Sequence, residues 1–179
     1  MHPPYYFIVE RKIKMFRPTI MKKRLVNLTV QELKTMGITT LLLDVDNTLS
    51  THHSQIPLEG IVPWLNEMKE QGINLFLVSN AKGKRVAPFA KQLGIEYFSL
   101  CKKPLPFGVL RAIKQLNVPK NAVMLCGDQL FTDMPAGRLA GIKTLLVEPA
   151  QLESGWTFRV RRKLEKPLLS RYHRKENTI

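Results

Sequence analysis

Residues 41–50 read LLLDVDNTLS. An apolar run passes directly into Asp44 and Asp46, with Thr48 two residues further on. Buried strands of a parallel sheet read as continuous apolar runs, because helices cover both faces of such a sheet. Two neighbouring carboxylates repel each other unless a cation lies between them. The stretch is therefore typical of a strand that ends in a ligand-binding loop, and an ordinary Asp-rich turn is the alternative.

Strand patterns alternate with helical patterns from residue 38 onward. Strands are predicted over residues 38–43, 73–78, 95–99, 122–126 and 142–147, and helices over residues 60–71, 83–93, 105–116 and 133–140. A shorter helix comes before them, since Thr29 and Glu32 have the spacing of a capping box and Gly37 ends the pattern. The alternation predicts an α/β fold with a five-stranded, mainly parallel sheet and helices on both faces.

The positive charge of the chain is concentrated at its two ends. The 179 residues carry a net charge of +14. Residues 1–24 hold seven Lys/Arg against one Glu, and residues 156–179 hold eight Lys/Arg against two Glu. We therefore expect a basic lead-in over residues 1–28, a folded core over residues 29–150 and a basic C-terminal segment over residues 151–179.

The basic ends suit an anionic partner, either nucleic acid or an acidic membrane surface, and solvated tails are the alternative. Phe158, Leu164 and Tyr172 lie among the C-terminal cations, as in an amphipathic helix at a membrane interface. Packing of that segment on the sheet is equally compatible with the pattern. No apolar run approaches the roughly 20 residues of a membrane span.

Two features that the sequence lacks, a metal-binding cysteine pattern and a signal peptide, predict the compartment of the protein. Cys101 and Cys126 are the two cysteines, and they have no metal-binding spacing. The N-terminal stretch lacks the order of a signal peptide, and Met15 is a second candidate for the initiating residue. A cytoplasmic protein is therefore expected, with peripheral contact at the inner face of the membrane as an extension of this prediction.

Polar side chains follow four of the predicted strands. They are Asp44, Asp46, Asn47 and Thr48 after the first strand, Ser79 and Asn80 after the second, Lys102 and Lys103 after the third, and Asp128 and Asp133 after the fourth. The carboxyl ends of parallel strands meet at one edge of the sheet, where ligands bind. Ligand oxygens without a His or Cys cluster favour Mg²⁺. Carboxylates, hydroxyls and an ammonium at one edge together predict phosphoryl transfer.

Four short motifs resemble those of the haloacid dehalogenase superfamily of phosphohydrolases. They are DVDNT (44–48), VSN (78–80), KKP (102–104) and GDQLFTD (127–133), and they occur in this order. The resemblance covers about residues 25–150 and implies a Rossmann-like fold and a Mg²⁺-dependent phosphatase that works through an aspartyl-phosphate.

The resemblance also implies roles for the residues of the catalytic and metal sites. Asp44 is expected as the nucleophile and Asp46 as the general acid and base. Lys103 is expected to bridge the phosphate and the nucleophile. Mg²⁺ would be held by Asp44, the backbone carbonyl of Asp46 and Asp128, with Asp133 in a supporting position.

Substrate contacts are expected from Thr48, Ser79, Asn80 and Lys103, and Thr48 is also expected to support the motif loop. Lys102 is a weaker candidate than Lys103, because the lysine before the proline occupies the motif position. His52 and His53 lie close to the first motif, but adjacent residues point in different directions. We therefore expect them in a solvated loop and not in the site.

Within the superfamily, the phrases DVDNTL, GDQLFTD and RRKLEKP look like the YqeG-type bacterial group. That group is similar to the mitochondrial phosphatidylglycerophosphate phosphatases, which implies an anionic phospholipid head group as substrate. The sequence departs from these relatives in SNAKGK after the second motif and at Arg138. These positions are candidates for substrate contact.

The motif spacing leaves no room for a cap domain, the inserted domain that covers the site in many members that act on small metabolites. Asp44 and Ser79 are 35 positions apart, and Ser79 and Lys103 are 24 apart. A helix and a strand already occupy each interval. A capless, open site suits a phosphate carried by a large partner such as a lipid, a nucleic-acid end or a protein.

Two other functions remain open from the sequence. A phosphatase for nucleotides or nucleic-acid ends would use the same site, although few aromatic residues are interleaved with the cations for stacking on bases. No stable nucleic-acid complex is therefore expected. A basic binding protein that retains the fold without activity is the second alternative, and the complete set of catalytic side chains argues against it.

Overall fold

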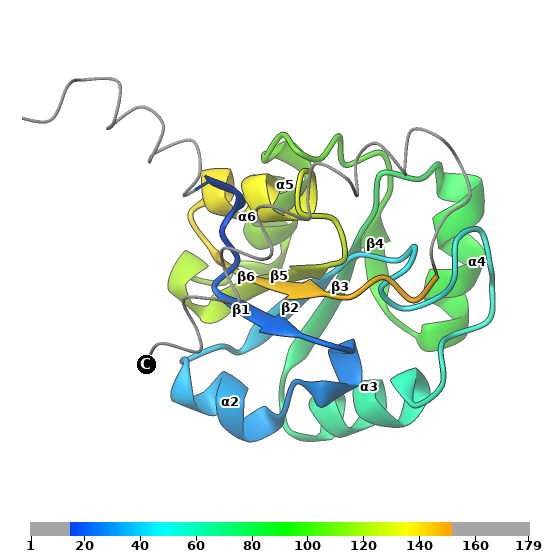
Figure 1. Ribbon diagram of the computed structural model, residues 1–179, viewed down its shortest axis with the longest axis horizontal. Helices are drawn as coiled ribbons and strands as arrows, with labels where there is room; N and C mark the ends of the chain where they lie inside the picture. The colour runs from blue at the N-terminus through cyan, green and yellow to red at the C-terminus, as the bar shows by residue number, and fades with distance from the viewer. Residues whose placement is uncertain (1–14, 152–179) are drawn as a thin grey trace, which may run out of the picture.

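The computed structural model describes residues 15–151 of the chain (Figure 1). Six strands form one parallel sheet in the order β1-β6-β5-β2-β3-β4. The strands are β1 (Ile20–Lys22), β2 (Thr40–Leu43), β3 (Asn74–Val78), β4 (Glu96–Phe98), β5 (Val123–Gly127) and β6 (Lys143–Val147). The predicted α/β class and the five predicted strands are confirmed, and β2, which leads into the first motif, lies between β5 and β3 at the centre.

Helices connect the strands and cover the sheet on both sides. They are α2 (Val30–Thr35), α3 (Ile61–Glu70), α4 (Gly83–Leu93), α5 (Phe107–Leu116) and α6 (Asp133–Ala140), with 3-10 turns η1 (Leu25–Asn27) and η2 (Lys120–Ala122). The predicted capping box is present at α2. The Thr29 hydroxyl accepts from the Glu32 N–H at 3.2 Å, and the Glu32 carboxylate accepts from the Thr29 N–H at 3.0 Å.

The side chains of β2 point alternately to the two faces of the sheet, and each face carries its own layer of the core. Leu41 and Leu43 pack with residues of α3 and α4 in one buried cluster, whereas Leu42 packs with residues of α5 and α6 in another. Successive strand side chains point to opposite faces, so a run of three buried leucines serves both layers. In Figure 1, α2 and α3 lie on one side of the sheet, and α5 and α6 lie on the other.

The sequence prediction missed the sixth strand. β1 pairs with β6, with Ile20 opposite Leu145 and Lys22 opposite Val147. It consists of three half-buried residues at the sheet edge, which is too short to show a strand period. Its residues lie inside the predicted basic lead-in, so part of that segment belongs to the sheet.

The connections at the carboxyl edge of the sheet are loops without an inserted domain. Within residues 15–151, residues 44–60 join β2 to α3, residues 79–82 join β3 to α4, and residues 99–106 join β4 to α5, and no cap domain is present. Over the same described part of the chain, no helix has the length and apolar character needed to cross a bilayer.

The packing of α6 on the sheet generates the first prediction. An added Cβ at Gly137 would lie 2.4 Å from Cγ2 of Thr144 and 3.4 Å from Cβ of Leu125. We expect Gly137→Ala to lower the free energy of unfolding in urea by about 1–3 kcal/mol through overpacking. At a helix position without such a close contact, Gly→Ala would instead raise the free energy of unfolding by up to about 1 kcal/mol.

Gly83→Ala is the matched control, since its added Cβ would meet Ser99 Oγ at an ordinary 3.5 Å. This variant should unfold within about 0.5 kcal/mol of the unchanged chain. A Gly137→Ala protein as stable as the Gly83→Ala protein would show that α6 does not depend on this close approach.

Candidate active site

The site begins where β2 ends. The Asp44 N–H donates to the Cys126 carbonyl of β5 at 2.9 Å, so the ladder between the two strands continues to this residue. The side chain of Asp44 is almost fully buried, with 5% of the residue exposed. The central position of β2 therefore fixes one carboxylate rigidly at the carboxyl edge of the sheet.

The Lys103 ammonium lies between two carboxylates, one directly after β2 and one at the start of α6. Its Nζ atom is 2.6 Å from Asp44 Oδ1 and 2.6 Å from Asp133 Oδ1. It also donates to the Val78 carbonyl at 3.0 Å. All three side chains are buried, so these ion pairs are only weakly screened by solvent.

Burial and charge shift the protonation of this cluster. Burial raises the pKa of the Asp44 carboxyl to about 7, against the opposing attraction of Lys103. Burial by itself lowers the pKa of the Lys103 ammonium, but Asp133 and Asp44 outweigh it and raise that pKa above its usual value. Lys103 therefore stays protonated, and a divalent cation beside Asp44 would favour its ionised form.

The second motif holds the loop that carries Lys103. Asn80 Nδ2 donates to the Lys103 carbonyl at 2.8 Å, and the Lys103 N–H donates to Asn80 Oδ1 at 2.7 Å. The Ser79 carbonyl accepts from the Cys101 N–H at 3.0 Å, and its hydroxyl accepts from the Ala81 N–H at 3.1 Å. The described contacts of Asn80 are thus with the protein backbone, and its contact with substrate stays a prediction.

Three carboxylates meet beside this ammonium. Asp44, Asp128 and Asp133 each offer an oxygen within 4.8 Å of the others, and all three residues are buried. Asp133 Oδ2 also accepts from the Gln129 N–H at 3.0 Å. Asp133 thus contacts both Lys103 and the motif backbone, and its supporting role stays a prediction.

Gly127 permits this arrangement of the fourth motif. A Cβ added there would lie 2.3 Å from Cγ of Asp133, so any larger residue would displace the carboxylate. The sequence places Gly127 directly before Asp128, at the end of β5. A glycine at this position is therefore a packing requirement of the site.

Asp46 lies apart from the three clustered carboxylates. Its Oδ1 atom accepts from Arg85 Nη2 at 2.9 Å and from the backbone N–H of His53 at 3.1 Å. Arg85, on the first turn of α4, was not singled out by the sequence, because no local pattern distinguishes it from its basic neighbours. The two carboxylates of the first motif thus have different cations, Lys103 for Asp44 and Arg85 for Asp46.

The other predicted residues lie outside the carboxylate cluster. His52 and His53 are exposed, which confirms the expected solvated loop. Arg138 lies in the last turn of α6, at the opposite end of that helix from Asp133, and its Nε donates to the Arg17 carbonyl at 2.9 Å. Lys102 is exposed, whereas Lys103 is buried in the site.

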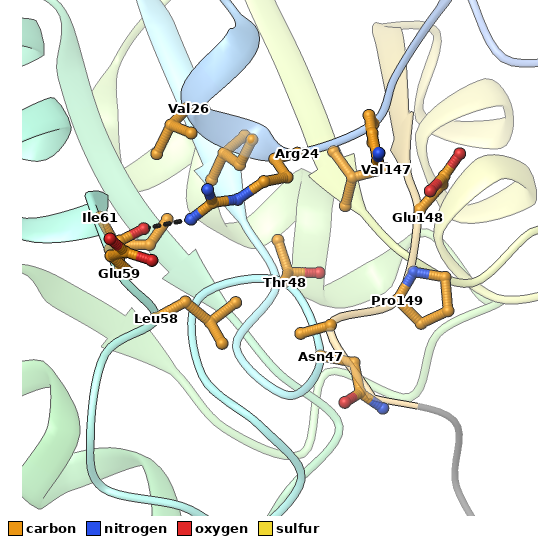
Figure 2. A pocket seen from close by; sticks show the side chains of 13 residues that line it. Arg24, Val26, Asn47, Thr48, Leu58, Glu59, Ile61, Val147, Glu148 and Pro149 are labelled. Atoms are coloured by element: carbon orange, nitrogen blue, oxygen red, sulfur yellow. Dashed lines mark hydrogen bonds between the residues drawn. The ribbon is translucent and has the colours of Figure 1, made fainter.

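A pocket of about 340 Å³ lies beside the motif loop (Figure 2). Its walls include Asn47 and Thr48, and the Thr48 hydroxyl is buried without a hydrogen-bond partner in the described part of the chain. Figure 2 shows Arg24 reaching across the pocket to donate to the Glu59 carbonyl. Its described lining includes none of the three clustered carboxylates, so the pocket is separate from the cluster.

The geometry can support transfer of a phosphoryl group. A buried carboxylate at Asp44 is oriented by an ammonium, and a second carboxylate at Asp46 is available for proton transfer. Lys103 can neutralise charge on phosphoryl oxygens, and the Asp44–Asp128–Asp133 cluster offers oxygen ligands for a hard cation.

A family model described as a haloacid dehalogenase-like hydrolase matches residues 7–141. The Bacillus subtilis (strain 168) protein named Probable phosphatase YqeG is 33% identical over 162 residues, which cover 90% of this chain and 94% of that protein.

Solved structures share the fold. The D,D-heptose 1,7-bisphosphate phosphatase from B. bronchiseptica, complexed with magnesium and phosphate, is 19% identical, with a TM-score of 0.53 and coverage of 61% of this chain and 80% of that one. A hydrolase from Streptococcus pneumoniae TIGR4 is 16% identical, with a TM-score of 0.53 and coverage of 73% and 100%. At these identities the likeness concerns the fold alone.

The buried ion pairs of Lys103 generate the second prediction. Lys103→Met removes the ammonium and leaves the Asp44 and Asp133 carboxylates buried without it. Because uncompensated buried charge is costly, we expect the free energy of unfolding of the metal-free protein to fall by about 3–5 kcal/mol at neutral pH. Urea unfolding in the presence of a chelator measures this change.

Lys102→Met is the matched control, since the neighbouring lysine is exposed. It removes the same charge and should change the free energy of unfolding by no more than about 0.5 kcal/mol. Equal stability of the two variants would contradict the ion-pair account.

Proposed function

The chain belongs to the haloacid dehalogenase-like hydrolases and is a phosphatase, and we propose that it hydrolyses phosphate monoesters through a phosphorylated Asp44. The observation that carries this proposal is the buried contact of 2.6 Å between Asp44 Oδ1 and Lys103 Nζ, beside Asp133. An ammonium in this position directs the carboxylate and can also meet the oxygens of an arriving phosphoryl group.

The proposed reaction has two steps. An Asp44 oxygen forms a bond to phosphorus while the ester P–O bond breaks, and Asp46 gives a proton to the leaving oxygen. Water then attacks phosphorus, Asp46 takes a proton from that water, and the P–O bond to Asp44 breaks. Inorganic phosphate is released, and the Asp44 carboxylate is restored. Lys103 and the Ser79 hydroxyl are proposed to contact the phosphoryl oxygens in both steps.

The donor set fits a hard divalent cation. Asp44, Asp128 and Asp133 form a cluster of three buried carboxylates, and the Lys103 ammonium contacts two of them, so the cluster keeps an excess of negative charge that a cation would balance. We propose Mg²⁺, held by Asp44, Asp128 and the Asp46 backbone carbonyl. When bound, it would neutralise charge on the phosphoryl oxygens. The magnesium and phosphate described for the B. bronchiseptica relative support this choice.

The proposed substrate is a phosphate monoester on an anionic phospholipid, with phosphatidylglycerophosphate as the best candidate. The motif resemblance to phosphatidylglycerophosphate phosphatases supports it, as does the lack of a cap domain between residues 15 and 151. The phosphate would then be presented at the inner face of the membrane, and the product would be phosphatidylglycerol.

The loop that carries Lys103 and the first residue of α5 share an exposed apolar surface. Leu100, Leu105 and Phe107 are 57%, 47% and 65% exposed. Lys102 lies among them, and residues 99–111 contain no acidic residue. Apolar side chains next to cations suit the interfacial region of an acidic bilayer. This surface supports a lipid substrate, and the basic ends of the chain would add to the attraction.

The nucleophile generates the third prediction. The unchanged protein should release phosphate from 4-nitrophenyl phosphate in the presence of Mg²⁺. Asp44→Asn should lower kcat at least about 10³-fold, because loss of a covalent nucleophile removes both steps. Glu70→Gln, at an exposed position of α3, is the control and should retain activity. Near-normal turnover by Asp44→Asn would refute the mechanism.

The substrate class generates the fourth prediction. Among phosphatidylglycerophosphate in acidic vesicles, nucleotides, 5′-phosphorylated oligonucleotides and sugar phosphates, the lipid should give the highest kcat/KM. Phe107→Ser should lower activity on the vesicles and leave activity on soluble 4-nitrophenyl phosphate unchanged, because it removes only the apolar contact with the bilayer.

Leu139→Ser, which changes an exposed apolar residue in the C-terminal half of α6, is the matched control for Phe107→Ser. It should leave both activities unchanged. Preference for a nucleotide or for an oligonucleotide end would replace the lipid with the nucleic-acid alternative while leaving the chemistry at Asp44 in place.

A further inference from the structure

Arg85 joins the first turn of α4 to the loop that follows β2. Its Nη2 atom donates to Asp46 Oδ1 and to Ser50 Oγ, both at 2.9 Å. Its guanidinium lies over the Phe89 ring, with Cζ 5.5 Å from the ring centroid. Gln55 Nε2 donates back to the Arg85 carbonyl at 3.0 Å and ties the loop to the helix a second time. Arg85 is therefore held on several sides while it holds Asp46.

The two oxygens of the Asp46 carboxylate have different surroundings. Oδ1 accepts from Arg85 and from the His53 N–H. Within residues 15–151, both hydrogen bonds to this carboxylate go to Oδ1 and Oδ2 accepts none. A carboxylate fixed through one oxygen has a defined orientation, because rotation would break both of the bonds to Oδ1. The other oxygen is left for the reacting atoms.

The remaining donors of Arg85 show that stability alone does not explain this arginine. Its Nε and Nη1 atoms are buried, and neither has a hydrogen-bond partner in residues 15–151. Buried donors without partners cost free energy that an apolar side chain of similar length would not cost. An arginine that leaves two of its three nitrogens unpaired is better explained by the task of the third, the contact with Asp46.

We propose that Arg85 is a positioning residue for the phosphatase reaction: it holds Asp46 through Oδ1 so that Oδ2 exchanges the proton with the leaving oxygen and then with water. This inference rests on the proposed role of Asp46. In the first step the ester P–O bond breaks, its electron pair stays on the leaving oxygen, and the proton on Oδ2 passes to that oxygen. In the second step Oδ2 takes one proton from the attacking water.

The dependence on the leaving group tests this role. The 4-nitrophenolate leaves as a stable anion, whereas phenolate is more basic and needs the proton more. We expect Arg85→Met to lower kcat/KM for phenyl phosphate about 10²-fold, near the lower range for loss of a general acid. The loss for 4-nitrophenyl phosphate should be smaller by at least about tenfold. The ratio kcat/KM includes the step in which the leaving group departs, so it reports the difference between the two substrates.

Three further variants complete the comparison. Arg85→Lys keeps a cation that can donate to Asp46 and should restore part of the activity on phenyl phosphate. Lys91→Met removes an exposed cation from the same helix and should leave both substrates unaffected. Thermal unfolding should show that Arg85→Met is folded. If it is not, Arg85→Lys carries the test, with a smaller loss that is again larger for phenyl phosphate.

The outcomes separate this inference from the proposed function. Equal losses on both substrates, or no loss, would overturn the role of Arg85, since a structural defect does not distinguish leaving groups. Asp46→Asn should show the same dependence on the leaving group, and Asp44→Asn should be inactive on both. Activity in Asp44→Asn would refute the proposed function itself. A third outcome would refute only the inference on Arg85. In it, Asp44→Asn is inactive and Asp46→Asn loses more activity on phenyl phosphate, but Arg85→Met loses the same activity on both substrates or none.

Discussion

The buried ammonium of Lys103 lies between the carboxylates of Asp44 and Asp133, and the rest of the site depends on this contact. Without it, carboxylates from β2 and α6 would face each other in a nonpolar interior, where repulsion is strong and solvation is lost. With it, the edge keeps an excess of negative charge that suits a hard cation. One interaction thus holds the folded edge together and also orients Asp44, the proposed nucleophile.

The fold supplies each partner of this contact from a different element. β2 is paired on both sides up to Leu43, and the Asp44 N–H continues the pairing with β5. Asn80, after the neighbouring strand, holds the Lys103 backbone with two hydrogen bonds. The close approach of Gly137 to the sheet seats α6, whose first residue is Asp133. Substitutions that disturb the packing of these elements, even far from the site, should therefore change the positions of Asp44, Lys103 and Asp133.

The motif residues could be predicted from the sequence because each follows an apolar strand, and parallel strands bring their carboxyl ends to one edge. The α2 cap at Thr29 could equally be predicted, since Thr29 and Glu32 are only three positions apart. Arg85 was not, because its contact with Asp46 spans 39 positions and no helical or strand period marks it. β1 was missed for a related reason: its three residues form a strand only through their pairing with β6.

The central claim is that phosphate passes through Asp44. The most direct measurement is to quench the protein during turnover, reduce the acyl-phosphate with borohydride and locate the modified residue by peptide mass spectrometry. The account predicts modification at Asp44, in amounts that follow the rate of product formation. Modification of another residue, or rapid turnover with inversion of configuration at phosphorus, would contradict it.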